Sequence, residues 1–138
     1  MNATARWFFV PISAVAVWYT VIFLGIGGIG VLDWMCPPDR MVSDVCTADW
    51  HAPAVDAWML VCVAIAATGI VLVPSRMAPS HRFRVAAAAY ATGAAFATWA
   101  AQHGTLWAPF CVAGVSGGAA LWLVWRGAKS PSPSAMPC

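Results

Sequence analysis

The chain alternates between long apolar runs and short polar segments. Four apolar runs occupy about residues 7–32, 55–73, 85–102 and 106–125. A helix rises about 1.5 Å per residue, so roughly 20 apolar residues cross a hydrocarbon core about 30 Å thick. The first run is longer than the roughly 7–15 apolar residues of a cleaved signal peptide, so we expect a retained helix. The pattern therefore predicts an all-α integral membrane protein whose residues 1–126 form four transmembrane helices.

The polar segments between these runs differ in character. Residues 33–54 are long and acidic, residues 74–84 form a connector rich in proline and arginine, and a His-Gly-Thr turn separates the last two runs. Pro53 suits the first turn of the second helix, and Pro74 is expected to end it. Residues 127–138 are rich in proline and serine and are expected to form a disordered cytoplasmic tail.

Composition points to lipid as the medium around most of the chain. Hydrophobic residues make up 62% of the sequence and charged residues only 9%, whereas about a quarter of the residues in a soluble domain are charged. So few charged side chains cannot cover the surface of a soluble domain. The net charge of +2 gives no reason to expect a nucleic-acid partner.

The distribution of charge predicts the orientation of the helices. All five acidic residues lie within residues 33–56, and Arg40 is the one Lys or Arg among the seven that lies in the same segment. Lys and Arg near span ends mark the cytoplasmic side, so both termini and the connector 74–84 are expected there. Residues 33–54 then form an ordered outer loop, and tryptophans lie near both expected membrane boundaries. The composition suggests a bacterial inner membrane.

Small residues recur at spacings that favour close helix packing. They are Gly25, Gly28, Ala89, Gly93, Ala97, Gly114 and Gly118. Such residues let helix backbones approach each other where lipid supplies no hydrophobic drive for association. The alanine-rich third run is therefore expected to be central in the bundle. Gly114 and Gly118 form a GxxxG pair, for which we expect an internal contact while a homodimer face stays open.

Cys36 and Cys46 flank a Pro-Pro turn in the outer loop. A disulfide between them is the favoured interpretation, and closing this loop would stabilise the fold by about 3 kcal/mol in the chain-entropy model. A redox-active pair is less favoured, because catalytic dithiols usually occur in a CxxC motif that this chain lacks. Free thiols and a metal site are the remaining alternatives.

The outer loop is also the expected recognition surface. Its candidate residues are Trp34, Asp39, Arg40, Asp44, Asp49, Trp50 and His51. The two tryptophans are expected to seat the loop on the membrane, with the charged side chains directed outward. Part of the acidity arises by default, because hydrocarbon excludes carboxylates from the spans.

His51 and His103 are expected at the same outer face. A two-histidine metal site is one interpretation, and two interfacial histidines bonded to water or backbone is the favoured one. Cys36, Cys46 and His51 lack the closely paired spacing of zinc ligands. A haem held by two histidines would need them on facing helices within the membrane. No metal and no cofactor are therefore predicted.

The predicted spans carry no Asp, Glu, Lys, Arg or His in their middles. Ion-coupled transporters normally place ionisable groups there, so that class is disfavoured. The basic connector residues Arg76, Arg82 and Arg84 either bind anionic lipid head groups or only set the topology. No catalytic set is recognised, and an enzyme is disfavoured.

Three functions remain in view. The first is an accessory, assembly or immunity-type membrane protein that docks through its outer loop on another membrane or periplasmic protein. The second is a small oligomeric transporter or channel that uses the small-residue faces. The third is a thiol-redox or metal-binding protein facing the periplasm.

Overall fold

The computed structural model describes residues 3–78, 80–104 and 107–129. Within these ranges the chain forms four helices, as predicted: α1 (Ala3–Trp34), α2 (His51–Met77), α3 (Arg82–His103) and α4 (Trp107–Lys129). Three of the described helices are long and apolar enough to cross a membrane, over Trp7–Trp34, His51–Met77 and Trp107–Ala128. The all-helical prediction is confirmed, and the apolar helices are compatible with a membrane protein.

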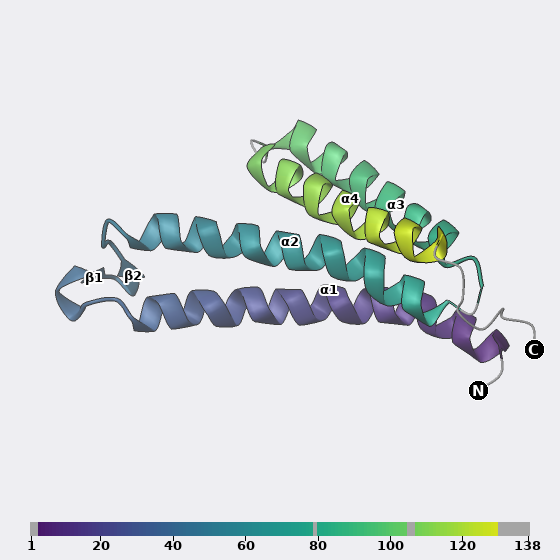
Figure 1. Cartoon of the computed structure of the whole chain (residues 1–138). Coiled ribbons are helices and arrows are strands. Elements are labelled where there is room, and N and C mark those ends of the chain that lie inside the picture. Colours follow the sequence, from purple (N-terminus) through teal and green to yellow (C-terminus); the bar gives the residue numbers. More distant parts are fainter. Residues whose placement is uncertain (1–2, 79, 105–106, 130–138) are drawn as a thin grey trace, which may run out of the picture.

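The helices form two antiparallel pairs, α1 with α2 and α3 with α4 (Figure 1). The pairs meet near the connection between α2 and α3 and diverge toward the other end (Figure 1). Helix α2 packs against all three of the others, and α3 packs against α2 and α4. The central position expected for the alanine-rich helix α3 therefore belongs to α2.

Helix α2 does not end at Pro74, contrary to the prediction. It continues through Pro74 to Met77, although proline lacks the N–H that would bond to the carbonyl of Ile70. Pro74 and Ser75 are buried, and the Ser75 hydroxyl donates a hydrogen bond to the carbonyl of Leu72 at 2.8 Å. Burial against neighbouring helices thus outweighs the local cost of one missing backbone bond.

Most of the predicted connector 74–84 is consequently helical. Of the described residues, 78, 80 and 81 lie between α2 and α3, and His81 precedes α3 in the left-handed conformation, with a φ of 55°. At the C-terminal end α4 continues to Lys129, so residues 127–129 of the predicted tail are helical. The rest of that tail, residues 130–138, lies outside the described residues.

The α1–α2 pair is held by close approaches at glycines. A Cβ added at Gly28 would overlap the indole of Trp58, and the Trp58 Nε1–H donates to the carbonyl of Gly25 at 3.3 Å. At the other end of the pair, a Cβ at Gly69 would lie 2.8 Å from Val17 Cγ1. Gly25 and Gly28 therefore lie in the helix contact for which the sequence proposed them, and Gly69 is a further contact that the sequence analysis missed.

The second pair joins the first through a small core. Val71 of α2, Ala86 of α3 and Ala120 of α4 are almost fully buried there. The Tyr90 hydroxyl donates to the carbonyl of Gly114 at 3.4 Å, and a Cβ at Gly117 would lie 3.1 Å from the Tyr90 ring. Of the predicted GxxxG pair, Gly114 contacts Tyr90 through its carbonyl, and a Cβ at Gly118 would lie 3.7 Å from the Tyr90 hydroxyl. A Cβ at Gly114 would meet no described atom within 4 Å.

Gly28→Ala is expected to lower the free energy of unfolding by about 1–3 kcal/mol, because the new methyl group would displace the Trp58 indole. Gly27→Ala is the matched control, since an added Cβ at Gly27 meets no described atom within 4 Å. The control should be neutral or slightly stabilising, as alanine favours helix over glycine. Unfolding of both variants in mixed micelles measures the difference, and equal stability of the two would contradict this account of the contact.

Candidate functional site

Between α1 and α2 the chain forms a short hairpin that sequence analysis did not foresee. A 3-10 turn, η1 (Pro38–Arg40), leads into β1 (Met41–Val42), which pairs antiparallel with β2 (Val45–Cys46). Ser43 and Asp44 connect the strands with φ values of 52° and 64°. Positive φ at both central residues is the pattern of a type I′ turn, which matches the twist of paired strands. We call residues 36–47 the clipped hairpin.

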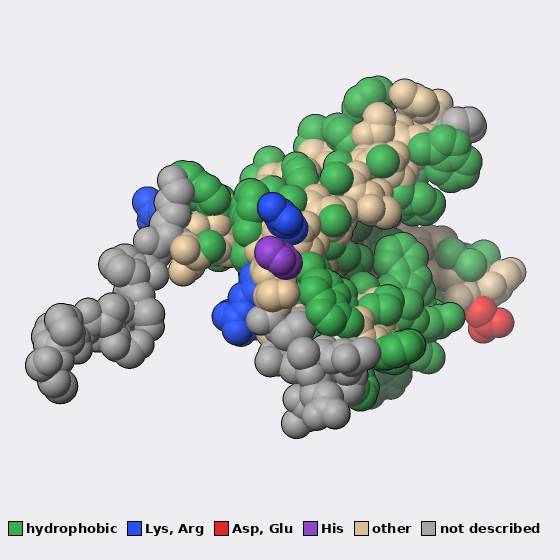
Figure 2. Space-filling model, turned by 90° about the vertical axis from the view of Figure 1, so that its right-hand side faces the viewer, with side chains coloured by type: hydrophobic (Ala, Val, Ile, Leu, Met, Phe, Trp, Pro, Cys, Tyr) green, Lys and Arg blue, Asp and Glu red, His purple; other side chains and the backbone are tan. Residues whose placement is uncertain are grey.

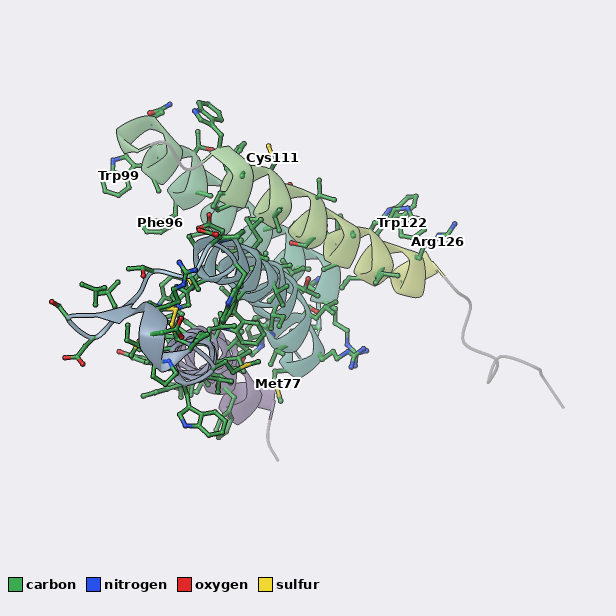
Figure 3. All side chains as sticks on the ribbon, turned by 90° about the vertical axis from the view of Figure 1, so that its left-hand side faces the viewer. Met77, Phe96, Trp99, Cys111, Trp122 and Arg126 are labelled. Carbon is green, nitrogen blue, oxygen red and sulfur yellow. A yellow bond between two sulfur atoms is a disulfide. The ribbon has the colours of Figure 1, made fainter. Side chains whose placement is uncertain are left out.

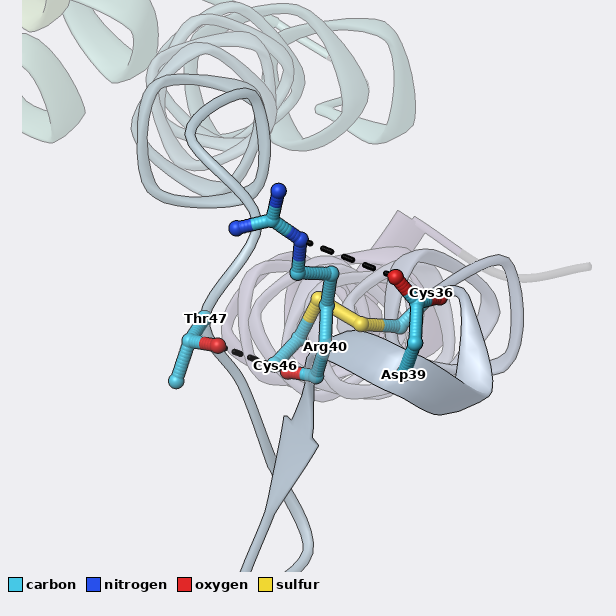
Figure 4. A network of polar contacts seen from close by, with 5 residues as sticks. All are labelled: Cys36, Asp39, Arg40, Cys46 and Thr47. Carbon is cyan, nitrogen blue, oxygen red and sulfur yellow. Dashed lines mark hydrogen bonds and ion pairs between the residues drawn. A yellow bond between two sulfur atoms is a disulfide. The ribbon is translucent and has the colours of Figure 1, made fainter.

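The clipped hairpin is closed covalently at its base. Cys36 and Cys46 are buried and lie at disulfide distance, as predicted (Figure 4). The carbonyl of Arg40 accepts hydrogen bonds from the Thr47 N–H at 2.9 Å and from the Thr47 hydroxyl at 2.7 Å. An exposed ion pair joins Arg40 to Asp39 at 3.8 Å, and such surface pairs contribute little.

A second contact fixes the base of the hairpin to the helix ends. His51 Nε2 lies 2.8 Å from Asp33 Oδ1, which links the last turn of α1 to the first turn of α2. The His51 ring also meets Trp50 edge to face, with centroids 5.8 Å apart. His51 therefore joins the two helix ends through Asp33. Asp33 was not among the residues singled out from the sequence.

The proposed metal ligands can be compared only within the described residues. The side chain of His103 lies outside the described part of the chain. Within the described residues there is no group of three His, Cys, Asp or Glu side chains placed to hold a metal ion.

The clipped hairpin exposes apolar side chains as well as charges. Val42 and Val45 are 60% and 62% exposed and stand opposite each other in the ladder. Side chains alternate between the two faces of a strand, so these valines lie on the face away from the buried Cys46. Trp34, the last residue of α1, is 86% exposed. The remaining predicted surface residues, Asp39, Arg40, Asp44, Asp49 and Trp50, are exposed too.

A cavity separates the two helix pairs, and we call it the interhelical groove. Its volume is about 240 Å³, and it is lined by all four helices. Ala89, Gly93 and Ala97, expected to pack against a neighbouring helix, form part of its wall. An added Cβ at Gly93 would meet no described atom within 4 Å. The small residues of α3 therefore face open space in this region, because the helix pairs diverge here.

Basic residues gather at the end of the bundle opposite the hairpin. Arg76 lies in the last turn of α2, while Arg82 and Arg84 lie in the first turn of α3, and all three are exposed. Figure 2 faces this end and shows arginine or lysine side chains beside a histidine. Cations are unfavourable at a helix N-terminus, so Arg82 and Arg84 are not placed to stabilise α3. Their position fits either alternative proposed from the sequence, lipid head groups or topology alone.

Comparisons of this chain with protein-family models, with curated proteins and with solved structures find no match. The clipped hairpin and the interhelical groove must therefore be interpreted from their own geometry.

Replacing both hairpin cysteines, as Cys36→Ser with Cys46→Ser, is expected to destabilise the hairpin by about 3 kcal/mol, because the open loop regains conformational entropy. Hydrogen exchange of residues 41–46 should accelerate strongly, while exchange in α4 stays unchanged. Cys111→Ser is the control, since Cys111 is exposed and unbonded to another cysteine. Unchanged protection of residues 41–46 in the double variant would show that the clip does not hold the hairpin.

Proposed function

We propose that this protein is a non-enzymatic accessory subunit of the bacterial inner membrane, which docks on another integral membrane protein through the clipped hairpin. Assembly factors and immunity-type inhibitors belong to the same class. The observation that carries the proposal is the pair of exposed valines, Val42 and Val45, on a covalently closed hairpin.

Rigidity makes the clipped hairpin suited to recognition. Two strands of two residues each are too short to be stable alone, so the disulfide and the helix ends must hold them. A binding element that is ordered beforehand loses less conformational entropy when it associates. Apolar side chains held outward on such an element, with polar neighbours, are typical of interaction sites. Asp39 and Asp44 would add selectivity for a partner with basic residues.

The proposal includes a definite placement in the membrane. All four helices span it, both termini are cytoplasmic, and the clipped hairpin faces the periplasm. Helix α3 has 22 residues, about 33 Å of helix, and runs antiparallel beside α4, so it would cross wherever α4 crosses. The exposed arginines lie at one end of the bundle and the acidic hairpin at the other. A periplasmic hairpin would also lie in a compartment where disulfides persist.

The alternative functions draw less support from the geometry. A channel needs a path across the bundle, but the core of Val71, Ala86 and Ala120 lies across the connector end of the groove. A thiol-redox role needs a cysteine that a partner thiol can reach. Both Cys36 and Cys46 are buried.

Cysteine labelling tests the placement. In a background without Cys62, Cys111 and Cys138, we expect Ser43→Cys and Gly104→Cys to react with a membrane-impermeant maleimide in intact spheroplasts. Ser80→Cys, at the opposite end of α3 from Gly104, should react only after permeabilisation. Equal labelling at positions 80 and 104 would mean that α3 does not cross the membrane.

Site-specific photo-crosslinking tests the docking role. A benzophenone amino acid at position 42 or 45 should give adducts with one membrane protein, whereas the same group at exposed Met77 should not. That protein should also co-purify with the native chain in mild detergent. The variant Val42→Ser with Val45→Ser should lose it, while Met77→Ser retains it. The same adducts at all three positions, or a complex unchanged by the valine substitutions, would contradict the proposal.

A further inference from the structure

A second cavity of about 290 Å³ lies beside the interhelical groove along α2. Both cavities are lined by Trp18, Val63 and Ala66, so they adjoin at these residues. Their linings extend from Met59 to Val71 on α2, which corresponds to about 18 Å of helix. Together the two cavities extend along the axis of α2.

The walls of this space are apolar. The linings of both cavities consist of aliphatic, aromatic and small side chains, and they contain no charged residue within the described part of the chain. The hydroxyl of Tyr90 already donates its hydrogen to the carbonyl of Gly114. Such walls offer no site for an ion or a sugar, and they fit a hydrocarbon.

The size of the two cavities decides between two apolar occupants, a further helix and a single hydrocarbon chain. A helix with its side chains is about 10 Å wide and fills on the order of 80 Å³ per ångström of length. The two cavities, of about 240 and 290 Å³, would together hold only about one turn of such a helix. A single methylene chain is slender enough to lie along these two cavities. Their 18 Å extent is about the length of a fatty acyl chain and over half of the roughly 30 Å hydrocarbon core.

We propose that the interhelical groove holds one acyl chain of a phospholipid. The chain enters between the diverging helix pairs, on the part of α3 that carries Phe96 and Trp99. These side chains project from the same side of α3, with ring centroids 5.9 Å apart (Figure 3). The buried core of Val71, Ala86 and Ala120 stops the chain at its other end. The lipid therefore belongs to the leaflet on the hairpin side.

Gly93 provides the open wall that the chain needs. Any larger side chain at this position would extend into the groove, because an added Cβ meets no described atom there. The inference rests on the proposed placement in the membrane and not on the docking role. The labelling of positions 43, 80 and 104 tests the membrane placement separately. A wrong placement can therefore be distinguished from a groove that binds no acyl chain.

The test uses the full-length protein in vesicles of phosphatidylglycerol and phosphatidylethanolamine that contain a diazirine-labelled acyl phosphatidylglycerol. After irradiation we expect adducts in the groove, on Ala97, Phe96 or Ala113, in excess over adducts on the exposed residues Phe8 and Phe23. Gly93→Leu should reduce the groove adducts by at least about tenfold, since even one extra methylene group in an apolar pocket changes binding by about 10–200-fold. The adducts on Phe8 and Phe23 serve as the internal reference.

Two further variants keep the test decisive. Gly27→Leu adds the same side chain on an exposed face of α1 outside both linings, and it should leave the groove adducts unchanged. Ala97→Phe should block the groove if Gly93→Leu does not fold, as judged by circular dichroism and gel filtration. Groove adducts no more frequent than those on Phe8 and Phe23, or insensitive to both blocking variants, would overturn the proposal. If an unlabelled polyisoprenyl phosphate reduced the groove adducts and unlabelled phosphatidylglycerol did not, the choice of a phospholipid as the ligand would be overturned. If Gly93→Cys formed a disulfide between two copies of the chain, the groove would be the contact site of a second chain.

Discussion

The separation of charged residues from the apolar helices is the constraint on which the rest of this structure depends. The acidic residues are confined to residues 33–56, so the helices contact one another through apolar and small side chains. Such contacts require close approach of the helix backbones. The contacts of Gly28 with Trp58 and of Gly69 with Val17 provide it for the first pair. The two helix pairs diverge from each other, and the interhelical groove lies between them.

The helices and the cysteine pair could be predicted from the sequence because each depends on local properties. Apolar length indicates a helix that can cross a bilayer, and two cysteines separated by ten positions in a polar loop can meet without help from the rest of the fold. Pro74 was misjudged because local propensity argues for a helix end there. Burial of Pro74 and Ser75, which depends on neighbouring helices, decided otherwise.

The small residues show more clearly what their spacing in the sequence cannot predict. Gly93 and Gly117 have the same lack of a side chain and lie on facing helices. Gly117 meets the ring of Tyr90, whereas Gly93 faces open space within the described structure. Spacing in the sequence identifies a small surface but does not say whether a helix covers it. The hairpin could not be predicted from local sequence either. Its strands have only two residues each and depend on the disulfide that closes the loop.

The disulfide also changes what a single cut in this chain would mean. Arg40 is the one arginine or lysine between Cys36 and Cys46. Cleavage after Arg40 would break the backbone between α1 and the other helices. The two fragments would stay covalently linked, because the disulfide between Cys36 and Cys46 would still join them. The nicked molecule would migrate as one species until a reductant was added. In a compartment with proteases, the two parts of the protein are thus connected by two independent routes, and loss of either one leaves the other.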